Sequence, residues 1–407
     1  MNKFRESNRK SYVRAIVLVA VMIGITTTSN HLRANTGPCE GVPTTLPFTD
    51  VPVDNVFFCA IAAAYFSGLT NGTTATTYAP SANVPREQMA AFVTRTMDQS
   101  LKRGSRRAGL DQYWTTQVAN NLGLTDVGDG PALVRSDGDS LWVANAISGT
   151  ISRVQASNGK VVQTWTGAAN ALGVLCAMGK VFVTGATTPG TLYQIDPTQA
   201  AGAVTTLSSA LGAGPSGIAF DGQRIWTANT TGESVSIITL NPPSITNAVT
   251  GFSTLFGIIY DGANMWVTDN NAGNPGKLHK LGSNGAILLT VDVGNTPLYP
   301  FFDGTNIWVP NRNSDTVSVV RATGGLAGTV LATLSGNGLN APRQAAFDGE
   351  RILVTNGAGN SVSLWRATDF TPIGTFSTGA GTAPLGVCGD GLNFWITLQD
   401  ADRLARF

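Results

Sequence analysis

Histidine is scarce in this 407-residue sequence, which contains only His31 and His279. Two histidines so far apart give no basis for a multi-histidine metal site, and no Ser-His-Asp set can be assembled around them. A glycine-rich phosphate loop and a dinucleotide-binding fingerprint are also lacking. The sequence therefore predicts neither a cofactor nor a metal centre, and we expect His279 to be a surface residue.

Charged residues make up only 13% of the chain, whereas it has 43% hydrophobic residues and 47 glycines. This composition is typical of β-rich chains with many tight turns. If residues 1–34 are removed, 20 basic and 24 acidic residues remain, a net charge of −4. That balance excludes the basic surface that nucleic acids require.

Residues 1–34 have the pattern of an export signal. A basic start is followed by the apolar run at 15–25 and then by polar residues. The run is short for a membrane span, which needs about 20 residues, but it suits the core of a signal peptide. We expect cleavage after Ala34 and a secreted or cell-surface protein without a membrane span; an uncleaved anchor is the alternative.

The sequence contains four cysteines. Cys39 and Cys59 flank one short segment, and exported proteins meet an oxidising compartment, so we expect these two to form a disulfide. Cys176 and Cys388 occupy near-equivalent places in repeats that should not be neighbours. We expect each of them to be a buried free thiol.

Residues 35–103 form a small module with helical patterning. Asp54 is expected to cap a helix over residues 57–69, in which apolar residues recur at helical spacing. A turn-rich loop follows. Pro85 then suits the first position of a second helix, with Glu87 in its first turn.

Part of this module resembles the S-layer homology (SLH) family. The matching segments are 48–51 (Phe-Thr-Asp-Val), 68–72 (Gly-Leu-Thr-Asn-Gly), 78–80 (Tyr-Ala-Pro) and 84–92 (Val-Pro-Arg-Glu-Gln-Met-Ala-Ala-Phe). The resemblance implies attachment to cell-wall glycan, with Asp50, Arg86 and Glu87 as glycan-binding residues; an arginine fork suits carboxylate-bearing sugars. The family usually has three modules and this chain has one. A helical cap that contacts other proteins is the alternative.

From about residue 125 one pattern recurs seven times. An apolar strand is followed by Asp-Gly and two further residues, then by a strand with an aromatic residue, then by Asn or Asp. The aromatic position is filled, at intervals of 40 to 45 residues, by Trp142, Phe182, Trp226, Trp266, Trp308, Leu353 and Trp395. This interval is the length of a four-stranded propeller blade. The sequence predicts a mainly-β fold with a seven-bladed β-propeller over residues 125–407.

The last copy stops after its third strand. We expect residues 104–124 to contain a linker and, within 113–124, the missing outer strand that closes the ring. The repeated Trp-Val-x-Asn and Thr-Val-Ser-Val segments resemble the YVTN-type repeat of bacterial surface-layer proteins and the related NHL-type repeat. That resemblance is specific for the fold and weak for function.

The Asn or Asp that ends each second strand recurs in five copies, which favours a structural role. We expect these side chains to bond the backbone of their own turn, and the Asp of each Asp-Gly pair to stabilise its hairpin. The residues concerned are Asn145, Asn229, Asp269, Asn311, Asn356 and Asp137, Asp221, Asp261, Asp303, Asp348, Asp390.

Nine residues before each aromatic position lies a residue expected to face the central channel. These residues are Leu133, Gly173, Gly217, Gly257, Tyr299, Gln344 and Gly386. The glycines would let neighbouring backbones approach closely. Phe256, Tyr299, Arg343 and Gln344 are candidates for a ligand-binding mouth; alternatively, they plug the channel.

The function predicted from these features is that of a surface binding or scaffold protein. Its expected partners are cell-wall polysaccharide or other surface proteins. The alternative is an exported lyase or lactonase that acts at the channel mouth. Glutamate is scarce in the propeller, where only Glu233 and Glu350 occur, which makes a lactonase-type metal site the weaker hypothesis.

Overall fold

The computed structural model describes residues 35–39, 42–66, 70–85, 89, 123–240, 243–248, 251–270 and 275–407. The chain divides into two compact units, Met1–Ser100 and Leu101–Phe407. The expected signal segment and almost all of the expected second helix lie outside the described residues. In the part of the chain that is described, no helix has the length and apolar character of a membrane span.

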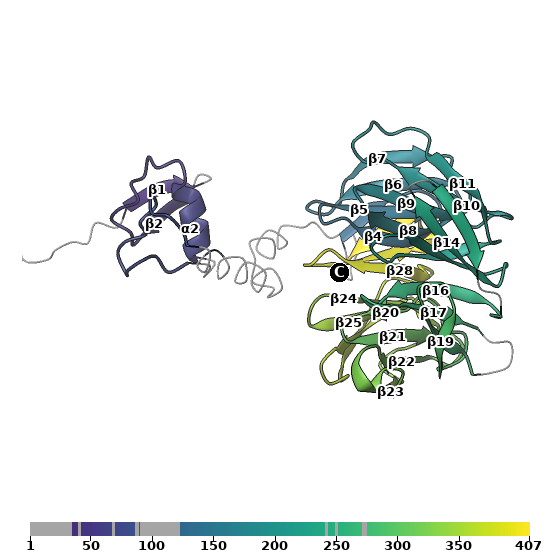
Figure 1. The fold of residues 1–407 in the computed structure, drawn as a ribbon. Coiled ribbons are helices and arrows are strands. Elements are labelled where there is room, and N and C mark those ends of the chain that lie inside the picture. The colour runs from purple at the N-terminus through teal and green to yellow at the C-terminus, as the bar shows by residue number, and fades with distance from the viewer. Residues whose placement is uncertain are drawn as a thin grey trace, which may run out of the picture. The chain divides into compact units, whose positions relative to one another are not determined.

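The first unit contains a hairpin and one helix (Figure 1). Strands β1 (Asn35–Cys39) and β2 (Val42–Leu46) pair antiparallel and are followed by helix α2 (Phe58–Phe66). The hairpin was not predicted. The expected cap by Asp54 is not found among the described residues: Asn55 Oδ1 accepts a hydrogen bond from Phe57 N at 2.8 Å in the turn that precedes the helix, and Phe57 O accepts the first helical bond, from Ile61 N.

A small core and a disulfide hold this unit together. The buried residues are Leu46, Phe48, Val51, Phe58, Ile61 and Ala62. Cys39 of β1 is bonded to Cys59 of α2, with their Cα atoms 5.5 Å apart. The bond ties the hairpin to the helix, which matters because so few residues bury only a modest apolar area.

The described part of the second unit forms seven four-stranded antiparallel sheets, which confirms the predicted seven-bladed propeller (Figure 1). Blade 1 comprises β4 (Pro131–Ser136), β5 (Ser140–Asn145), β6 (Thr150–Gln155) and β7 (Val161–Thr166). Blade 2 comprises β8 (Ala171–Ala177), β9 (Lys180–Gly185), β10 (Gly190–Ile195) and β11 (Thr205–Leu211). Blade 3 comprises β12 (Pro215–Phe220), β13 (Ile225–Asn229), β14 (Ser234–Leu240) and β15 (Pro243–Ala248). Blade 4 comprises β16 (Leu255–Tyr260), β17 (Met265–Asp269), β18 (Lys277–Leu281) and β19 (Ile287–Asp292).

The remaining blades repeat this order. Blade 5 comprises β20 (Phe301–Phe302), β21 (Asn306–Asn311), β22 (Thr316–Arg321) and β23 (Val330–Leu334). Blade 6 comprises β24 (Pro342–Phe347), β25 (Arg351–Asn356), β26 (Ser361–Arg366) and β27 (Pro372–Ser377). Blade 7 comprises β28 (Pro384–Gly389), β29 (Phe394–Leu398), β30 (Arg403–Arg406) and β3 (Gly123–Asp126). Two short 3-10 helices, Gly324–Leu326 and Gln399–Ala401, lie between strands.

The ring closes through a strand that precedes the first blade in sequence. Strand β3 pairs antiparallel with β30, from Gly123 opposite Arg406 to Asp126 opposite Arg403. This confirms that an N-terminal segment supplies the outer strand of blade 7. The strand is displaced from the predicted segment, however, and only residues 123–124 are common to both; residues 113–122 lie outside the described residues.

The repeated aromatic side chains are buried in the apolar layers between blades, and an aspartate holds each tryptophan. The Asp-Gly aspartate accepts two backbone N–H groups of its own turn, as expected, and also the indole Nε1–H of the tryptophan five residues later. The five indole bonds measure 2.7 to 2.8 Å and join Trp142 to Asp137, Trp226 to Asp221, Trp266 to Asp261, Trp308 to Asp303 and Trp395 to Asp390.

The first strands of the blades pack against one another around the axis, and glycine makes this possible. A Cβ atom on Gly217 would lie 2.6 Å from the carbonyl oxygen of Phe256 in the next blade. Such a contact is too close for any residue with a side chain. The predicted role of the glycines at this position is therefore confirmed.

Threonine hydroxyls on second strands connect neighbouring blades at four places in the part of the chain that is described. Each Oγ1 donates to a backbone carbonyl of the next blade: Thr184 to Ser216, Thr268 to Leu298, Thr355 to Leu385 and Thr397 to Ala132. The last of these bonds, at 2.6 Å, links blade 7 to blade 1. The last and first blades are thus connected by the same kind of hydrogen bond as the other neighbouring blades. In Figure 1 yellow β28 lies beside blue β4.

We predict that Asp303→Ala lowers the free energy of unfolding by about 2–3 kcal/mol, because it leaves the buried Trp308 indole N–H and two turn N–H groups without an acceptor. Urea denaturation measures the change. Trp308→Phe and the double variant complete a double-mutant cycle. Strictly additive losses would show that the indole bond contributes nothing.

Candidate functional site

The axis of the propeller is nearly filled. A cavity of about 10 Å³ remains there, lined by Leu133, Arg135, Val174, Gly217, Ile218, Gly257, Ile258, Tyr299, Pro300 and Gln344. This volume is about what one water molecule needs. Five of the seven residues predicted to face the channel line this cavity, whereas Gly173 and Gly386 do not. The cavity is too small for an organic substrate.

Two of the candidate mouth residues form hydrogen bonds to other blades near the axis. The Tyr299 hydroxyl lies 2.8 Å from Ser216 Oγ of blade 3, and burial raises the pKa of Tyr299. Gln344, which is 1% exposed, accepts a hydrogen bond at 2.8 Å from Val387 N of blade 7 through its Oε1. Both side chains thus act as struts between blades.

The other two candidates lie beside these struts. Arg343 donates from Nη1 to Gln399 Oε1 at 3.0 Å. Burial and the nearby Arg312 lower the pKa of Arg343, whereas Asp400 opposes this shift. Phe256 packs against an apolar cluster that includes Tyr299. The structure thus brings the four predicted residues into one region, where the contacts favour the alternative that they plug the channel.

Arg135 was missed by the sequence analysis, although it also lines the axial cavity. It lies seven residues before Trp142, on β4. The corresponding residues of the other blades are all uncharged: Leu175, Ala219, Ile259, Phe301, Ala346 and Cys388. The sequence signal that could have identified Arg135 is its charge at a position of the first strand that is uncharged in every other blade.

The two free cysteines lie close enough to Arg135 to interact with it electrostatically. Burial and, to a smaller extent, the nearby Asp137 raise the pKa of Cys176 to about 12, against the opposing effect of Arg135. Burial also raises the pKa of Cys388. Both thiols are therefore protonated at neutral pH and unreactive. Cys388 is buried as expected, whereas Cys176 is only partly buried.

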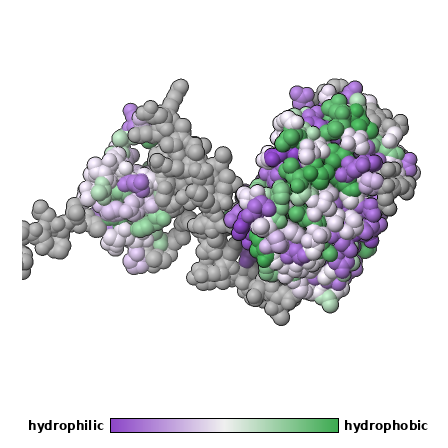
Figure 2. All heavy atoms as spheres, turned by 90° about the horizontal axis from the view of Figure 1, so that it is seen from below, coloured by the Kyte–Doolittle hydropathy of each residue, from purple (hydrophilic) through white to green (hydrophobic). Residues whose placement is uncertain are grey.

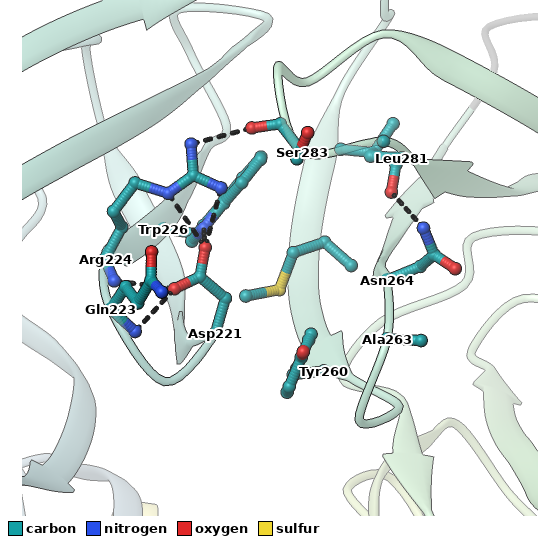
Figure 3. Close-up of a pocket in the computed structure, with 11 residues that line it drawn as sticks. Asp221, Gln223, Arg224, Trp226, Tyr260, Ala263, Asn264, Leu281 and Ser283 are labelled. Carbon is teal, nitrogen blue, oxygen red and sulfur yellow. Dashed lines mark hydrogen bonds and ion pairs between the residues drawn. The ribbon is translucent and has the colours of Figure 1, made fainter.

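A larger pocket of about 160 Å³ lies between blades 3 and 4, at the turns that follow their first strands. In Figure 3 Asp221 and Arg224 form one wall, and the turn that carries Ser283 forms the other. The Arg224 guanidinium is ion-paired with Asp221 and donates to Ser283 O at 2.7 Å, so it bridges the two blades. The pocket is smaller than most ligand sites and electrically balanced.

The recurring asparagines have partners different from those expected. Each donates from Nδ2 to two hydroxyls on the third strand of its blade, and not to its own turn. The bonds run from Asn145 to Thr150 and Ser152, from Asn229 to Ser234 and Ser236, from Asn311 to Thr316 and Ser318, and from Asn356 to Ser361 and Ser363. The side chain thus ties adjacent strands together.

Blade 4 replaces this Asn–Ser pair by Asp269 and His279. His279 is 7% exposed, so the expectation of a surface histidine was wrong. Its Nδ1 lies 2.9 Å from Thr290 Oγ1, and its Nε2 lies 3.4 Å from Asp269 Oδ2, which is long for a hydrogen bond. The replacement of both partners together keeps the buried pair complementary.

Asp269 also holds the loop that enters blade 4. Its carboxylate accepts the backbone N–H of Ser253 and Thr254, the latter at 2.8 Å. Burial alone would raise the pKa of Asp269, but His279 and these two N–H groups outweigh burial and hold the pKa below its ordinary value. Asp269 therefore stays ionised inside the protein.

In the first unit, Asp50 has a defined structural role. Its two carboxylate oxygens accept the backbone N–H groups of Tyr78 and Ala79, at 2.8 and 2.7 Å. Burial opposes the shift, but these bonds lower the pKa of Asp50. The other two predicted glycan-binding residues, Arg86 and Glu87, lie outside the described residues. The glycan-binding role of all three stays a prediction.

A search of the described residues finds no group of three or more His, Cys, Asp or Glu side chains placed to hold a metal ion. The chemistry available around the axis is therefore that of single hydroxyl, amide and guanidinium groups within those parts of the chain.

Comparison with solved structures shows the propeller fold. A catalytically inactive histidine-to-alanine variant of virginiamycin B lyase from Staphylococcus aureus, with quinupristin, is 15% identical (TM-score 0.58; 70% of this chain and 99% of that chain). Hydrazine synthase from Kuenenia stuttgartiensis is 14% identical (TM-score 0.58; 72% and 97%). The Cps50 (Swd1) β-propeller domain of Myceliophteria thermophila is 10% identical (TM-score 0.56; 70% and 99%).

These identities are low, so the likeness extends to the fold alone. A scan against protein-family models finds no match, and a search of curated proteins finds no match either. The SLH and YVTN or NHL resemblances therefore remain interpretations of the sequence.

We predict that Asp269→Asn lowers the free energy of unfolding by about 2 kcal/mol at neutral pH, because charge-assisted bonds to the entering loop are lost. Because the pKa of Asp269 is held below its ordinary value of 3.8, its carboxylate stabilises the fold above that pH. The difference between wild type and variant should shrink as the pH falls below 3.8.

Urea denaturation between about pH 3 and pH 7 measures this difference. Asp269→Asn with His279→Ser is the matched control, since it recreates the pair found in other blades and should recover part of the loss. A difference that grows toward acid pH would contradict the assignment.

Proposed function

We propose that this protein is an exported cell-surface binding protein. Its first unit attaches it to cell-wall glycan, and its propeller presents a rigid surface to a protein or polysaccharide partner. The observation that carries the proposal is the filled axis of the propeller, which leaves the outer surfaces of the disc as the place for recognition.

Export is supported by the disulfide in the first unit. Disulfides persist in oxidising compartments and are rare where thiols are kept reduced, and the Cys39–Cys59 bond joins two elements of one core. The expected cleavage after Ala34 is also compatible with the fold. Asn35 begins β1, and its Nδ2 donates to Phe48 O and Val51 O, so cleavage further along the chain would remove an integrated strand.

A binding role for the propeller is supported by its surface. Outer strands of several blades expose apolar side chains: Val161, Val162, Ile287, Leu288, Val330, Ile373 and Phe376. Figure 2 shows hydrophobic residues gathered over part of the propeller surface seen there, among hydrophilic ones. Exposed apolar areas of this kind are typical of surfaces that contact other macromolecules.

Attachment to glycan rests on the SLH resemblance of the first unit. The Phe48–Val51 segment of that resemblance is structurally important, because Phe48 and Val51 are fully buried and Asp50 anchors the loop at Tyr78. Because these bonds fix the loop at Tyr78 and Ala79, the chain that follows begins from a defined position. Arg86 is the residue we expect to contact an anionic sugar.

A lyase is the second candidate, because a solved structure that shares the fold is a lyase for which a histidine-to-alanine variant is described as catalytically inactive. In this chain His279 is the histidine of the propeller. Its Nε2 is buried and directed at Asp269. A substrate could not reach that nitrogen without displacement of the surrounding strands.

We predict that the mature protein, residues 35–407, is retained by beads that carry purified cell-wall polysaccharide, and that Arg86→Ala reduces retention about ten-fold, as expected for loss of one charge-assisted contact. Quantitative pull-down measures the effect. Lys160→Ala, which removes an exposed cation of the propeller, should leave retention unchanged.

Absence of retention of the intact protein would contradict the proposal. Turnover of quinupristin, lost in His279→Ala, would favour the lyase instead.

A further inference from the structure

The axis of the propeller carries two arginines in different surroundings. Arg343 donates to Gln399 and is close enough to Asp400 for a favourable electrostatic interaction. Arg135 lines the axial cavity from β4, and its electrostatic partners are the thiols of Cys176 and Cys388. Arg343 therefore has a side-chain acceptor and a countercharge. Arg135 has one backbone acceptor and no countercharge among the described residues.

The hydrogen bonds of Arg135 leave most of its donors unused. A guanidinium has five N–H donors. The hydrogen bond found for Arg135 runs from Nη1 to the carbonyl of the adjacent Val134, at 3.3 Å. Asp137, two residues along the chain, uses its carboxylate for Trp142 Nε1 and the backbone N–H of Asp139 and Ser140.

The neighbouring thiols do not supply a charge. Burial raises the pKa of Cys176 to about 12 and raises that of Cys388, so both remain protonated at neutral pH. Burial also lowers the pKa of Arg135, because the charged guanidinium is less well solvated there than in water. A guanidinium nevertheless stays charged in proteins, and a desolvated charge requires a partner.

Other groups around the cavity add donors and no negative charge. Gln344 uses its Oε1 to accept Val387 N, which leaves its NH₂ group as a donor. The remaining lining residues are apolar apart from Tyr299, whose hydroxyl bonds Ser216. As a whole residue Arg135 is only partly buried, although its guanidinium is desolvated enough for burial to lower its pKa.

We propose that Arg135 forms an anion-binding site at the axis of the propeller, which takes a small monovalent anion of halide size. The guanidinium supplies the charge and the directed N–H donors. The cavity of about 10 Å³ limits the occupant to a species little larger than water, so phosphate and sulfate do not fit. The bound anion neutralises the charge where blades 7, 1 and 2 meet.

Crystals of the mature protein soaked in sodium bromide provide the direct test. Anomalous scattering should reveal a bromide within hydrogen-bond distance of the Arg135 N–H groups. Bromide sites confined to the outer surface of an accessible crystal would overturn the proposal. This experiment uses the unaltered protein, so it does not depend on whether a variant folds.

In solution, line broadening in the bromide NMR signal reports binding, and chloride should displace the bound ion. Arg135→Met should weaken the displaceable component by about ten-fold or more, as expected for the loss of a charge-assisted contact, whereas Arg135→Lys should retain part of it. Arg343→Met is the matched control, because that guanidinium already has its partners. Equal loss in the two methionine variants, or none in Arg135→Met, would contradict the assignment.

Discussion

Contact between neighbouring blades is the constraint on which the propeller depends, because no blade can bury both of its apolar faces alone. The second strands make this plain: every residue of β5, β13, β17, β21 and β29 is buried. Each interface needs a partner on both sides, so the first and last blades must meet. Pairing of β3 with β30, and the bond from Thr397 to Ala132, complete the ring with the contacts used inside it.

Much of this architecture could be predicted from the sequence because its signals are local. Asp-Gly turns and an aromatic residue at a constant interval define the blade within some ten residues, so the blade number and the role of the inner glycines were correct. The closing strand was misplaced because β3 has only four residues and lies next to a longer strand-like segment. The expected cap at Asp54 was wrong because the helix begins later than predicted, at Phe58, and Asn55 accepts the Phe57 N–H in the turn before it.

Features that depend on strand register were harder to predict. The asparagine side chains reach hydroxyls five and seven residues later, and this proximity exists only after the second and third strands have paired. Asp269 and His279 follow the same geometry, since Val267 lies opposite His279 in the register. A paired departure from the Asn–Ser pattern was visible in the sequence, but its meaning required the fold. Arg135 likewise became notable only when the first strands were seen to enclose a small cavity.

The functional account follows from the same packing. A ring whose axis is filled by struts such as Tyr299 and Gln344 has little room there for an organic substrate, and on this basis we propose that recognition belongs to the outer surfaces and to the first unit. The proposed anion is consistent with this, because it completes the axis as a structural element. The solved structures that share the fold are a lyase, a hydrazine synthase and a Cps50 domain, all at low sequence identity. This variety is expected of a fold that carries unrelated activities.

Hydrogen exchange of the tryptophan indole protons tests the closed ring most directly. Five indole N–H groups, those of Trp142, Trp226, Trp266, Trp308 and Trp395, are held by aspartates between blades. Assigned by single Trp→Phe variants, their NMR signals should exchange slowly and at similar rates, because one interface cannot open without the next. Rapid exchange of any of them in the native protein, or rates that differ widely from blade to blade, would contradict a ring closed by equivalent contacts.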